Sequence, residues 1–314
     1  FSFTMDALPG TPQIQNIIPS AFFKTNAWAA PWLGVVGSTF ILLVGLTYLS
    51  WRRKQAATKN EGYGEGHINE PEPFSGESLP NPWIALVPLV AVGVLNRVFG
   101  EWIPQVYGKT HEMTLAAGGK PVITEVSKVA AIWAVEAALL VGILTVLVFS
   151  FKTVSKKFAE GTKAAVSGTL LASMNTASEY GFGAVIAILP GFLIVAEVLK
   201  AIPNPLINEA ITVTTLAGIT GSATGGMSIA LAAMADQFIA SANAASIPLE
   251  VLHRVASMAS GGMDTLPHNG AIITLLAVTG LTHRQAYGDI FAITCIKTVA
   301  VFVVIAFYYL TGLY

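Results

Sequence analysis

The sequence predicts an all-α polytopic membrane protein, because it is far more apolar than an ordinary soluble chain. Hydrophobic residues make up 54 % of its 314 residues and charged residues only 11 %, whereas soluble domains carry roughly 25 % charged residues. The mean hydropathy is +0.65. Several apolar stretches also reach the roughly 20 residues that a helix needs to cross a bilayer, so we expect a lipid bilayer around this chain.

The first predicted span covers residues 28–51. It carries Trp28, Trp32, Tyr48 and Trp51 near its two ends, as the interfaces between membrane and water favour. Two scaffold spans are then expected within residues 82–151. A longer stretch, 164–200, is interrupted by polar residues at 175–179, and a last span covers 288–312.

The stretch 204–240 is apolar but has Thr-Gly-Ser-Ala-Thr-Gly-Gly at its centre, residues 220–226. Its two halves are too short to cross a hydrocarbon core of about 30 Å separately. We expect a re-entrant hairpin whose tip lies near the middle of the membrane. Irregular backbone survives there only if protein surrounds it or a cavity adjoins it.

The stretch 250–281 is predicted to be a broken helix, because Gly-Met-Asp-Thr-Leu-Pro-His-Asn-Gly interrupts it at 262–270. Pro267 cannot donate a backbone hydrogen bond, and Gly262 and Gly270 loosen the turn. A helix that resumes at about Asn269 directs the positive end of its dipole toward the middle of the membrane. Unwound N–H groups at that point can bind an anion.

Basic residues set the orientation of these spans, since cytoplasmic loops are enriched in Lys and Arg. Nine of the 17 basic residues fall on one side of the predicted spans: Arg52, Arg53, Lys54, Lys59, Lys152, Lys156, Lys157, Lys163 and Arg284. Five fall on the other side: Lys24, Lys109, Lys120, Lys128 and Lys200. We therefore expect residues 55–81, rich in Glu, Gly, Pro and Asn, to be a cytoplasmic linker that divides the chain into 1–54 and 82–314.

An internal repeat relates the two parts of the chain. Met-Asp-Ala-Leu-Pro at 5–9 matches Met-Asp-Thr-Leu-Pro at 263–267 in four of five positions, and an apolar half-span and a full span follow each copy. Counted along the spans, the two copies cross in opposite senses, which is the inverted-repeat plan of many secondary transporters. The first copy has little chain before it, so we expect an N-terminal portion of about 150 residues to be missing.

These features give the candidate site residues. Candidates for substrate binding are Thr220, Gly221, Ser222, Ala223, Thr224 and Gly225 at the hairpin tip, Thr265, His268 and Asn269 in the broken helix, and Thr11 and Gln13 after the first copy of the repeat. Candidates for proton coupling are Asp264, Asp6 and His268, because an ionisable residue inside a membrane is costly and usually functional. Structural roles stay open: Ser222 or Thr224 can cap the returning helix, and Asp264 can cap a helix end.

Other polar residues in apolar stretches favour structural interpretations. Six charged residues are expected to pair with one another, to snorkel or to lie near interfaces: Arg97, Glu136, Glu197, Asp236, Arg254 and Lys297. Arg97 and Glu136 are a possible pair on adjacent scaffold spans, and His253 is expected near the outer face.

The composition also excludes several functions. A net charge of −1 provides no basic surface for nucleic acid. The single cysteine, Cys295, excludes an internal disulfide framework and a cysteine zinc cluster. The five histidines lack metal-ligand spacing, and no hydrolase or metalloprotease motif is present. We therefore expect no cofactor, no metal ion and no enzymatic activity.

Three segments, residues 3–16, 220–226 and 263–270, resemble the gluconate permease family of the ion transporter superfamily. The resemblance covers essentially the whole chain, and Met-Asp-Thr-Leu-Pro-His-Asn-Gly is its most specific part. It implies proton-coupled uptake of small organic acids across the bacterial inner membrane. It also implies two inverted repeats that each contain a re-entrant hairpin, a homodimer, and elevator-type alternating access. The members described as 3-hydroxybutyrate permeases are the more similar ones.

Together these features predict a proton-coupled secondary transporter of a small hydroxy-monocarboxylate, such as 3-hydroxybutyrate or gluconate. Sodium coupling is an alternative, because carboxylates and unwound carbonyls can also bind sodium. An anion channel is another alternative, since broken helices also build filters. An intramembrane enzyme that uses Asp6 and Asp264 as an acid pair is a third.

Overall fold

The computed structural model describes residues 6–61, 81–113 and 122–314, and within these ranges the chain is almost entirely helical. Its α-helices are α1 (Ile18–Phe23), α2 (Pro31–Thr58), α3 (Pro82–Tyr107), α4 (Val126–Lys156), α5 (Phe158–Ala187), α6 (Pro190–Lys200), α7 (Pro205–Thr220), α8 (Ala223–Ala244), α9 (Leu249–Ser260), α10 (Gly270–Thr279) and α11 (His283–Thr311). Two short 3-10 helices are η1 (Ile14–Asn16) and η2 (Met263–Thr265). An antiparallel hairpin pairs β1 (Thr110–Met113) with β2 (Val122–Glu125).

Four helices in the described part are long and apolar enough to cross a membrane: Pro31–Thr58, Trp83–Tyr107, Val129–Lys156 and His283–Thr311. Many of their large apolar side chains are exposed on the surface of the protein, as lipid-facing helices require. The predicted all-α polytopic membrane fold is therefore confirmed.

Local sequence fixes where several helices begin. Asn81 and Asn204 each accept a backbone N–H bond from the first turn of α3 and α7, and a proline follows each of them. Thr282 and Gln285 form a capping box at the start of α11. This cap explains why the last span begins earlier than the predicted position 288.

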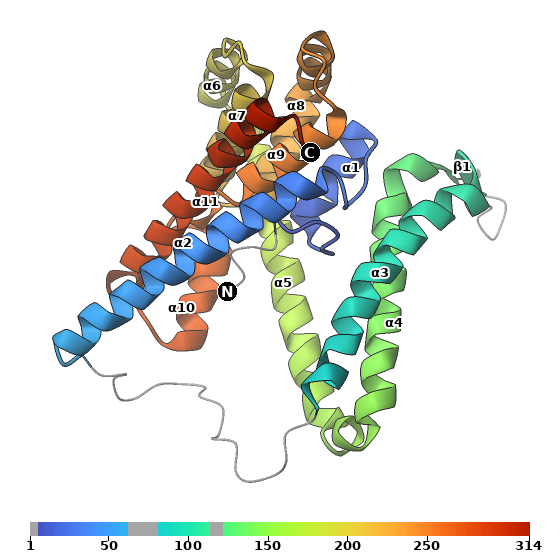
Figure 1. Cartoon of the computed structure of the whole chain (residues 1–314), viewed down its shortest axis with the longest axis vertical. Helices are drawn as coiled ribbons and strands as arrows, with labels where there is room; N and C mark the ends of the chain where they lie inside the picture. Colours follow the sequence, from blue (N-terminus) through green and yellow to red (C-terminus); the bar gives the residue numbers. More distant parts are fainter. Residues whose placement is uncertain (1–5, 62–80, 114–121) are drawn as a thin grey trace.

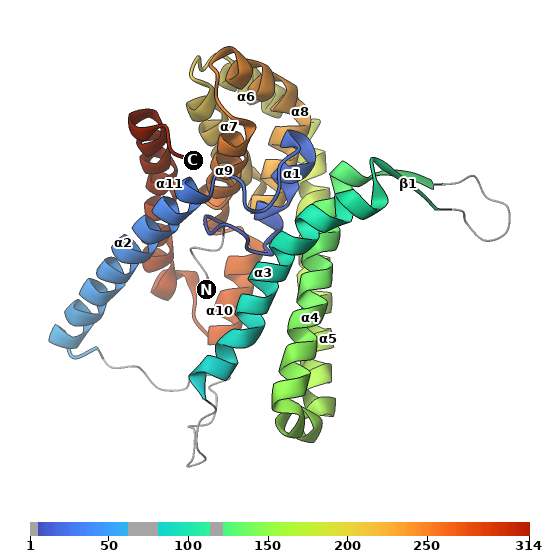
Figure 2. The same cartoon turned by 45° about the vertical axis from the view of Figure 1, so that its right-hand side comes forward.

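Helices α2 and α11 lie side by side and run antiparallel (Figures 1 and 2). The C-terminal part of α2 meets the N-terminal part of α11, where Arg52 Nε lies 2.6 Å from Asp289 Oδ1. The main hydrophobic core lies among α7, α8 and α9, and α1 and one face each of α2 and α11 pack against it. Helices α3 and α4 form a second antiparallel pair with the β-hairpin at one end (Figure 2).

Some sequence predictions for the second part are wrong. The stretch 164–200 is not interrupted at 175–179, because α5 continues through these residues, which include no glycine or proline. Ser178 Oγ donates to the carbonyl of Met174, so this hydroxyl is satisfied within the helix. The break instead precedes Pro190, whose ring cannot continue the hydrogen-bond ladder.

Two further expectations differ from the structure in detail. Arg97 pairs with Glu101, one turn further along α3, at 2.8 Å, and not with Glu136. Helix α2 continues to Thr58, so the first residues of the predicted linker 55–81 are helical. Most of the remaining linker, residues 62–80, lies outside the described residues.

Candidate functional site

The predicted broken helix is present between α9 and α10. Helix α9 ends at Ser260, the short helix η2 follows, and α10 begins at Gly270. Asn269 caps α10, because its Oδ1 accepts the backbone N–H of Ile272 at 3.0 Å. The prediction that the helix resumes at about Asn269 is therefore confirmed.

The predicted hairpin tip lies at the turn between α7 and α8. Gly221 ends α7 with a φ of +65°, a left-handed conformation that favours glycine. A side chain at this position would also meet the ring of His268. Ser222 caps α8, because its Oγ accepts the N–H of Gly225 at 3.1 Å, as predicted.

The remaining tip residues are engaged within the turn. Thr220 is buried, and its hydroxyl donates to the carbonyl of Leu216 at 2.8 Å. Thr224 Oγ1 lies 3.3 Å from Ser222 Oγ, and Ala223 is buried beside them. These contacts stabilise the turn. The side-chain hydroxyls of Thr220, Ser222 and Thr224 are therefore already hydrogen-bonded within it.

A hydrogen bond joins the hairpin tip to the broken helix. Asn269 Nδ2 donates to the carbonyl of Gly221 at 2.6 Å, and Asn269 is buried. The bond places the first residues of α8 and α10 close together, although the two segments are far apart in the sequence. His268 is exposed at this junction. The structure therefore brings together the candidates that the sequence took from two separate motifs.

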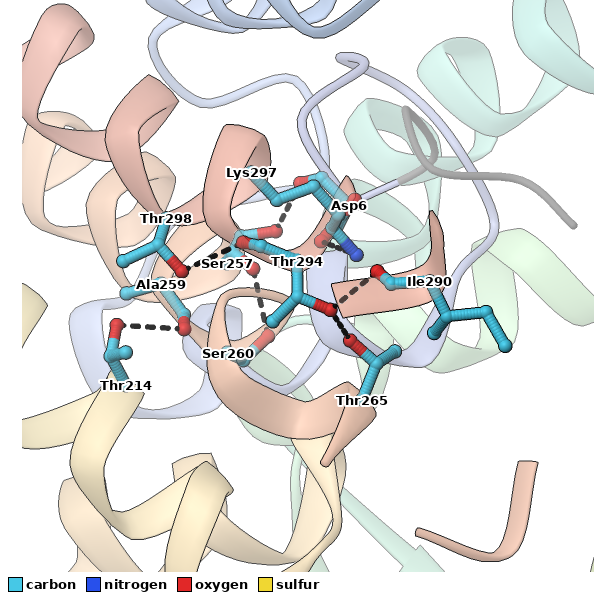
Figure 3. Close-up of polar contacts among 10 residues, drawn as sticks. All are labelled: Asp6, Thr214, Ser257, Ala259, Ser260, Thr265, Ile290, Thr294, Lys297 and Thr298. Carbon is cyan, nitrogen blue, oxygen red and sulfur yellow. Dashed lines mark hydrogen bonds and ion pairs between the residues drawn. The ribbon is translucent and has the colours of Figure 1, made fainter. Parts of the chain in front are cut away.

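The first copy of the repeat contacts α9 and α11. Ser257 Oγ donates to the backbone carbonyl of Asp6 at 2.6 Å. The Asp6 carboxylate forms an ion pair with Lys297, in which Nζ and Oδ2 lie 3.2 Å apart (Figure 3). The side chains of Lys297 and Asp6 are only 9 % and 4 % exposed. A side chain at Gly261 would fall on this carboxylate, so the glycine permits the close approach.

The second copy of the repeat contacts the same face of α11. The hydroxyls of Thr265 and Thr294 form a hydrogen bond (Figure 3). The hydroxyl of Tyr287 donates to the backbone carbonyl of Thr265 at 3.2 Å. Since Thr294 and Lys297 are spaced by three residues, they lie on one side of the helix. Asp6 and Thr265, one residue from each copy, therefore both meet this face of α11.

A cavity of about 290 Å³ adjoins these groups. Its lining residues are Leu49 of α2, Thr265 of η2, Leu275 of α10, and Asp289, Ile290, Ile293, Thr294 and Lys297 of α11. The cavity is thus lined by two threonines, a lysine, an aspartate and four aliphatic residues. Among the sequence candidates, Thr265 lines it.

The charges around Lys297 come from several elements. Lys297 interacts electrostatically with Asp264 as well as with Asp6, and Arg254 of α9 interacts with Asp6. Asp264 is partly exposed, whereas Arg254 is completely buried. Two carboxylates and two cations therefore gather where the copies of the repeat meet.

Arg254 and His253 hold the segment that follows the first copy. Arg254 donates to Asn16 Oδ1 at 2.9 Å and to three backbone carbonyls. His253 Nδ1 lies 2.6 Å from Thr25 Oγ1, and the histidine is fully buried beneath this segment. Its position near the outer face of the membrane stays a prediction.

Thr11 and Gln13 are not among the residues that line the cavity. Thr11 is buried, and its hydroxyl donates to the carbonyl of Leu8 at 3.0 Å. Gln13 directly precedes η1. Both candidates lie in the loop that Arg254 and Asn16 fasten to α9.

Lys297 and Thr294 are the site residues that sequence reasoning missed. Lys297 was expected to pair with another charge, to snorkel or to lie near an interface, and Thr294 had no assigned role. The available signal was the spacing of polar residues three and four apart in an apolar span, at Thr294, Lys297 and Thr298. Within the described residues, no group of three or more His, Cys, Asp and Glu side chains could hold a metal ion.

No known protein-family profile matches the chain, and no solved structure matches it. The chain is 53 % identical over 322 aligned residues to the uncharacterized transporter YxjC of Bacillus subtilis (strain 168). The match covers 100 % of this chain and 68 % of that protein. The chain belongs to this transporter family. Transport is thus its general function, and the four apolar helices agree with a location in a membrane.

Proposed function

We propose that the protein is a secondary active transporter that takes up a small hydroxy-monocarboxylate together with protons across the bacterial cell membrane. One observation carries the proposal: a buried ammonium group, Lys297, lines a cavity beside the hydroxyls of Thr265 and Thr294. Because an ammonium has three hydrogens to donate and Asp6 accepts at one oxygen, Lys297 can also bind a substrate carboxylate. The threonine pair is suited to a substrate hydroxyl.

The rest of the cavity wall favours a short, partly apolar acid. Leu49, Leu275, Ile290 and Ile293 line it, together with Asp289, whose carboxylate pairs with Arg52. A volume of about 290 Å³ is at the small end of ligand pockets. A chain with one hydroxyl and a methyl end, such as 3-hydroxybutyrate, matches this mixture better than a polyhydroxylated acid, whose additional hydroxyls would lack partners against the aliphatic wall.

The carboxylates next to Lys297 supply candidate proton carriers. Asp6 and Asp264 come from the two copies of the repeat, and both interact with Lys297. An inverted repeat that contributes one acid from each copy suits alternating access, because each half can present its acid to one side of the membrane. Elevator-type motion of a homodimer, as the resemblance implies, is part of this proposal.

Uptake by the full-length protein in proteoliposomes tests the proposal. Radiolabelled 3-hydroxybutyrate, gluconate and citrate are compared, with a proton gradient and a sodium gradient imposed separately. We expect saturable uptake of 3-hydroxybutyrate that exceeds uptake of the other two acids and collapses when an ionophore dissipates the proton gradient. Liposomes without protein are the control.

Other results of the same assay would identify sodium coupling or an anion channel. Uptake driven by the sodium gradient alone identifies sodium coupling. Passive, non-saturable flux that carries current identifies an anion channel. Absence of uptake of all three acids overturns the assignment to hydroxy acids.

A further inference from the structure

We propose that Lys297 binds the carboxylate of the substrate, and that Asp6 occupies this position on Lys297 when no substrate is bound. In this scheme a substrate carboxylate displaces Asp6 from Lys297, and the displaced Asp6 takes up the coupled proton. The inference rests on the proposed function and specifies how that function is coupled. In this scheme the Asp6–Lys297 ion pair breaks and re-forms during transport, in addition to stabilising the fold.

The first support is the position of Lys297. Its ammonium contacts Asp6 Oδ2 (Figure 3). Lys297 also lines the cavity, together with Thr265 and Thr294. An ammonium has more than one hydrogen to donate. A carboxylate that enters the cavity can therefore reach Lys297 without rearrangement of α11.

The second support is the cost of an unpaired charge. Lys297 and Asp6 are both almost completely buried, and a buried ion that loses its partner is strongly destabilising. Lys297 thus favours a directly bound anion, for which Asp6 and the substrate compete, while Asp264 contributes an electrostatic interaction. Asp6, once displaced, loses its ammonium partner and keeps only the electrostatic interaction with Arg254, so protonation removes the charge that Lys297 no longer compensates.

The third support is the free oxygen of Asp6. Within the described residues, Asp6 Oδ1 is buried and has no hydrogen-bond partner, whereas Oδ2 contacts Lys297. A carboxylate with one satisfied oxygen and one unsatisfied oxygen can accept a proton without losing another bond. The uptake step is the addition of one proton to the Asp6 carboxylate, and no other bond forms or breaks.

The local charge balance sets the stoichiometry. The charged groups that face this pair are Lys297 on α11, Asp264 on η2 and Arg254 on α9. Other charged or titratable groups on α9 and α11 have partners elsewhere, such as His253, which bonds to Thr25, and Asp289, which pairs with Arg52. Asp6, Asp264, Lys297 and Arg254 sum to zero charge. One bound monocarboxylate makes the cluster negative, and one proton restores neutrality.

Three variants of the full-length protein in proteoliposomes test this inference with 3-hydroxybutyrate. Asp6→Asn should keep substrate exchange and bind at least as tightly as the wild type, because no internal carboxylate competes, but it should lose accumulation driven by a proton gradient. Lys297→Gln should raise KM about tenfold or more. Lys156→Gln, which removes an exposed basic residue at the end of α4, is the control and should match the wild type.

The charge-swapped variant distinguishes a substrate-binding role of Lys297 from a purely structural role of the Asp6–Lys297 ion pair. Asp6→Lys combined with Lys297→Asp keeps an ion pair but removes the cation from the cavity wall, so we expect a folded protein that does not bind 3-hydroxybutyrate. If Lys297→Gln fails to fold, Asp6→Asn combined with Lys297→Gln removes both charges together, and it should fold but still show the raised KM. Thermal unfolding in detergent reports the folding of each variant.

Two results overturn the inference while the proposed function stands. One is wild-type KM in the charge-swapped variant or in any folded variant that lacks Lys297. The other is full proton-driven accumulation by Asp6→Asn. If the wild-type protein transports none of the acids, the proposed function itself has failed, so the two failures are distinguishable.

Discussion

Arg254 shows how one buried side chain organises a site without lining its cavity. Its guanidinium donates to Asn16 Oδ1 and to the carbonyls of Ala7, Ala27 and Ala29. Arginine suits this task because its donors form a planar fork and it stays charged. The result is that the segment carrying Asp6 is held against α9, which keeps the carboxylate next to Lys297.

Replacing Arg254 should therefore destabilise the whole protein. Arg254→Met leaves several buried carbonyls without a donor, and we expect a loss of about 3 kcal/mol or more. Arg284→Met, at an exposed position near the start of α11, is the matched control and should change stability by less than about 0.5 kcal/mol. Thermal unfolding in detergent measures both, and equal unfolding midpoints for the two variants would contradict this role of Arg254.

At the scale of elements, the breaks in helices follow local chemistry where the sequence supplies it. The turn at Gly221 needs a left-handed residue, and the start of α10 needs the cap that Asn269 provides. Residues 175–179 look polar enough to interrupt a span, but they lack a glycine or proline, and α5 continues through them. Polarity alone thus predicts a break poorly, because a helix can satisfy short polar side chains internally.

The hydrogen bond between Asn269 and Gly221 makes a prediction about how elements cooperate. Asn269→Ala loses the cap of α10, worth about 1 kcal/mol, and also the tie to the hairpin tip. Asn81→Ala loses only the cap of α3. We expect both variants to be destabilised modestly, but only Asn269→Ala to reduce 3-hydroxybutyrate uptake several-fold in the proteoliposome assay. Equal uptake by the two variants would show that the tie has no part in transport.

In the molecule as a whole, the two copies of the repeat are associated with the antiparallel helices α2 and α11. The two copies of Met-Asp-x-Leu-Pro precede these two helices, and the acids of both copies approach Lys297. The cavity lies where α2, η2, α10 and α11 meet. In the proposed alternating access, movement of one half relative to the other would change a site at this junction.

The charge balance of the site predicts that transport is electroneutral. One monocarboxylate carried with one proton moves no net charge, so an imposed membrane potential should leave the rate of 3-hydroxybutyrate uptake unchanged. Each uncompensated charge would instead respond by about 2.3 kcal/mol per 100 mV. Potassium gradients with valinomycin set the potential in proteoliposomes at constant pH difference. Faster uptake at an inside-negative potential would reveal an additional cation.

Features that depend on neighbouring residues could be predicted from the amino-acid sequence. Apolar length and composition gave the membrane class, and glycine, proline and capping residues gave the turn at Gly221 and the restart at Asn269, because φ and cap preferences act over a few residues. Three contacts became visible only in the folded chain: Lys297 with Asp6, Thr265 with Thr294, and Arg254 with the segment that follows the first motif. These partners lie on different elements, and their contact depends on how α9, η2 and α11 pack, which no local pattern specifies.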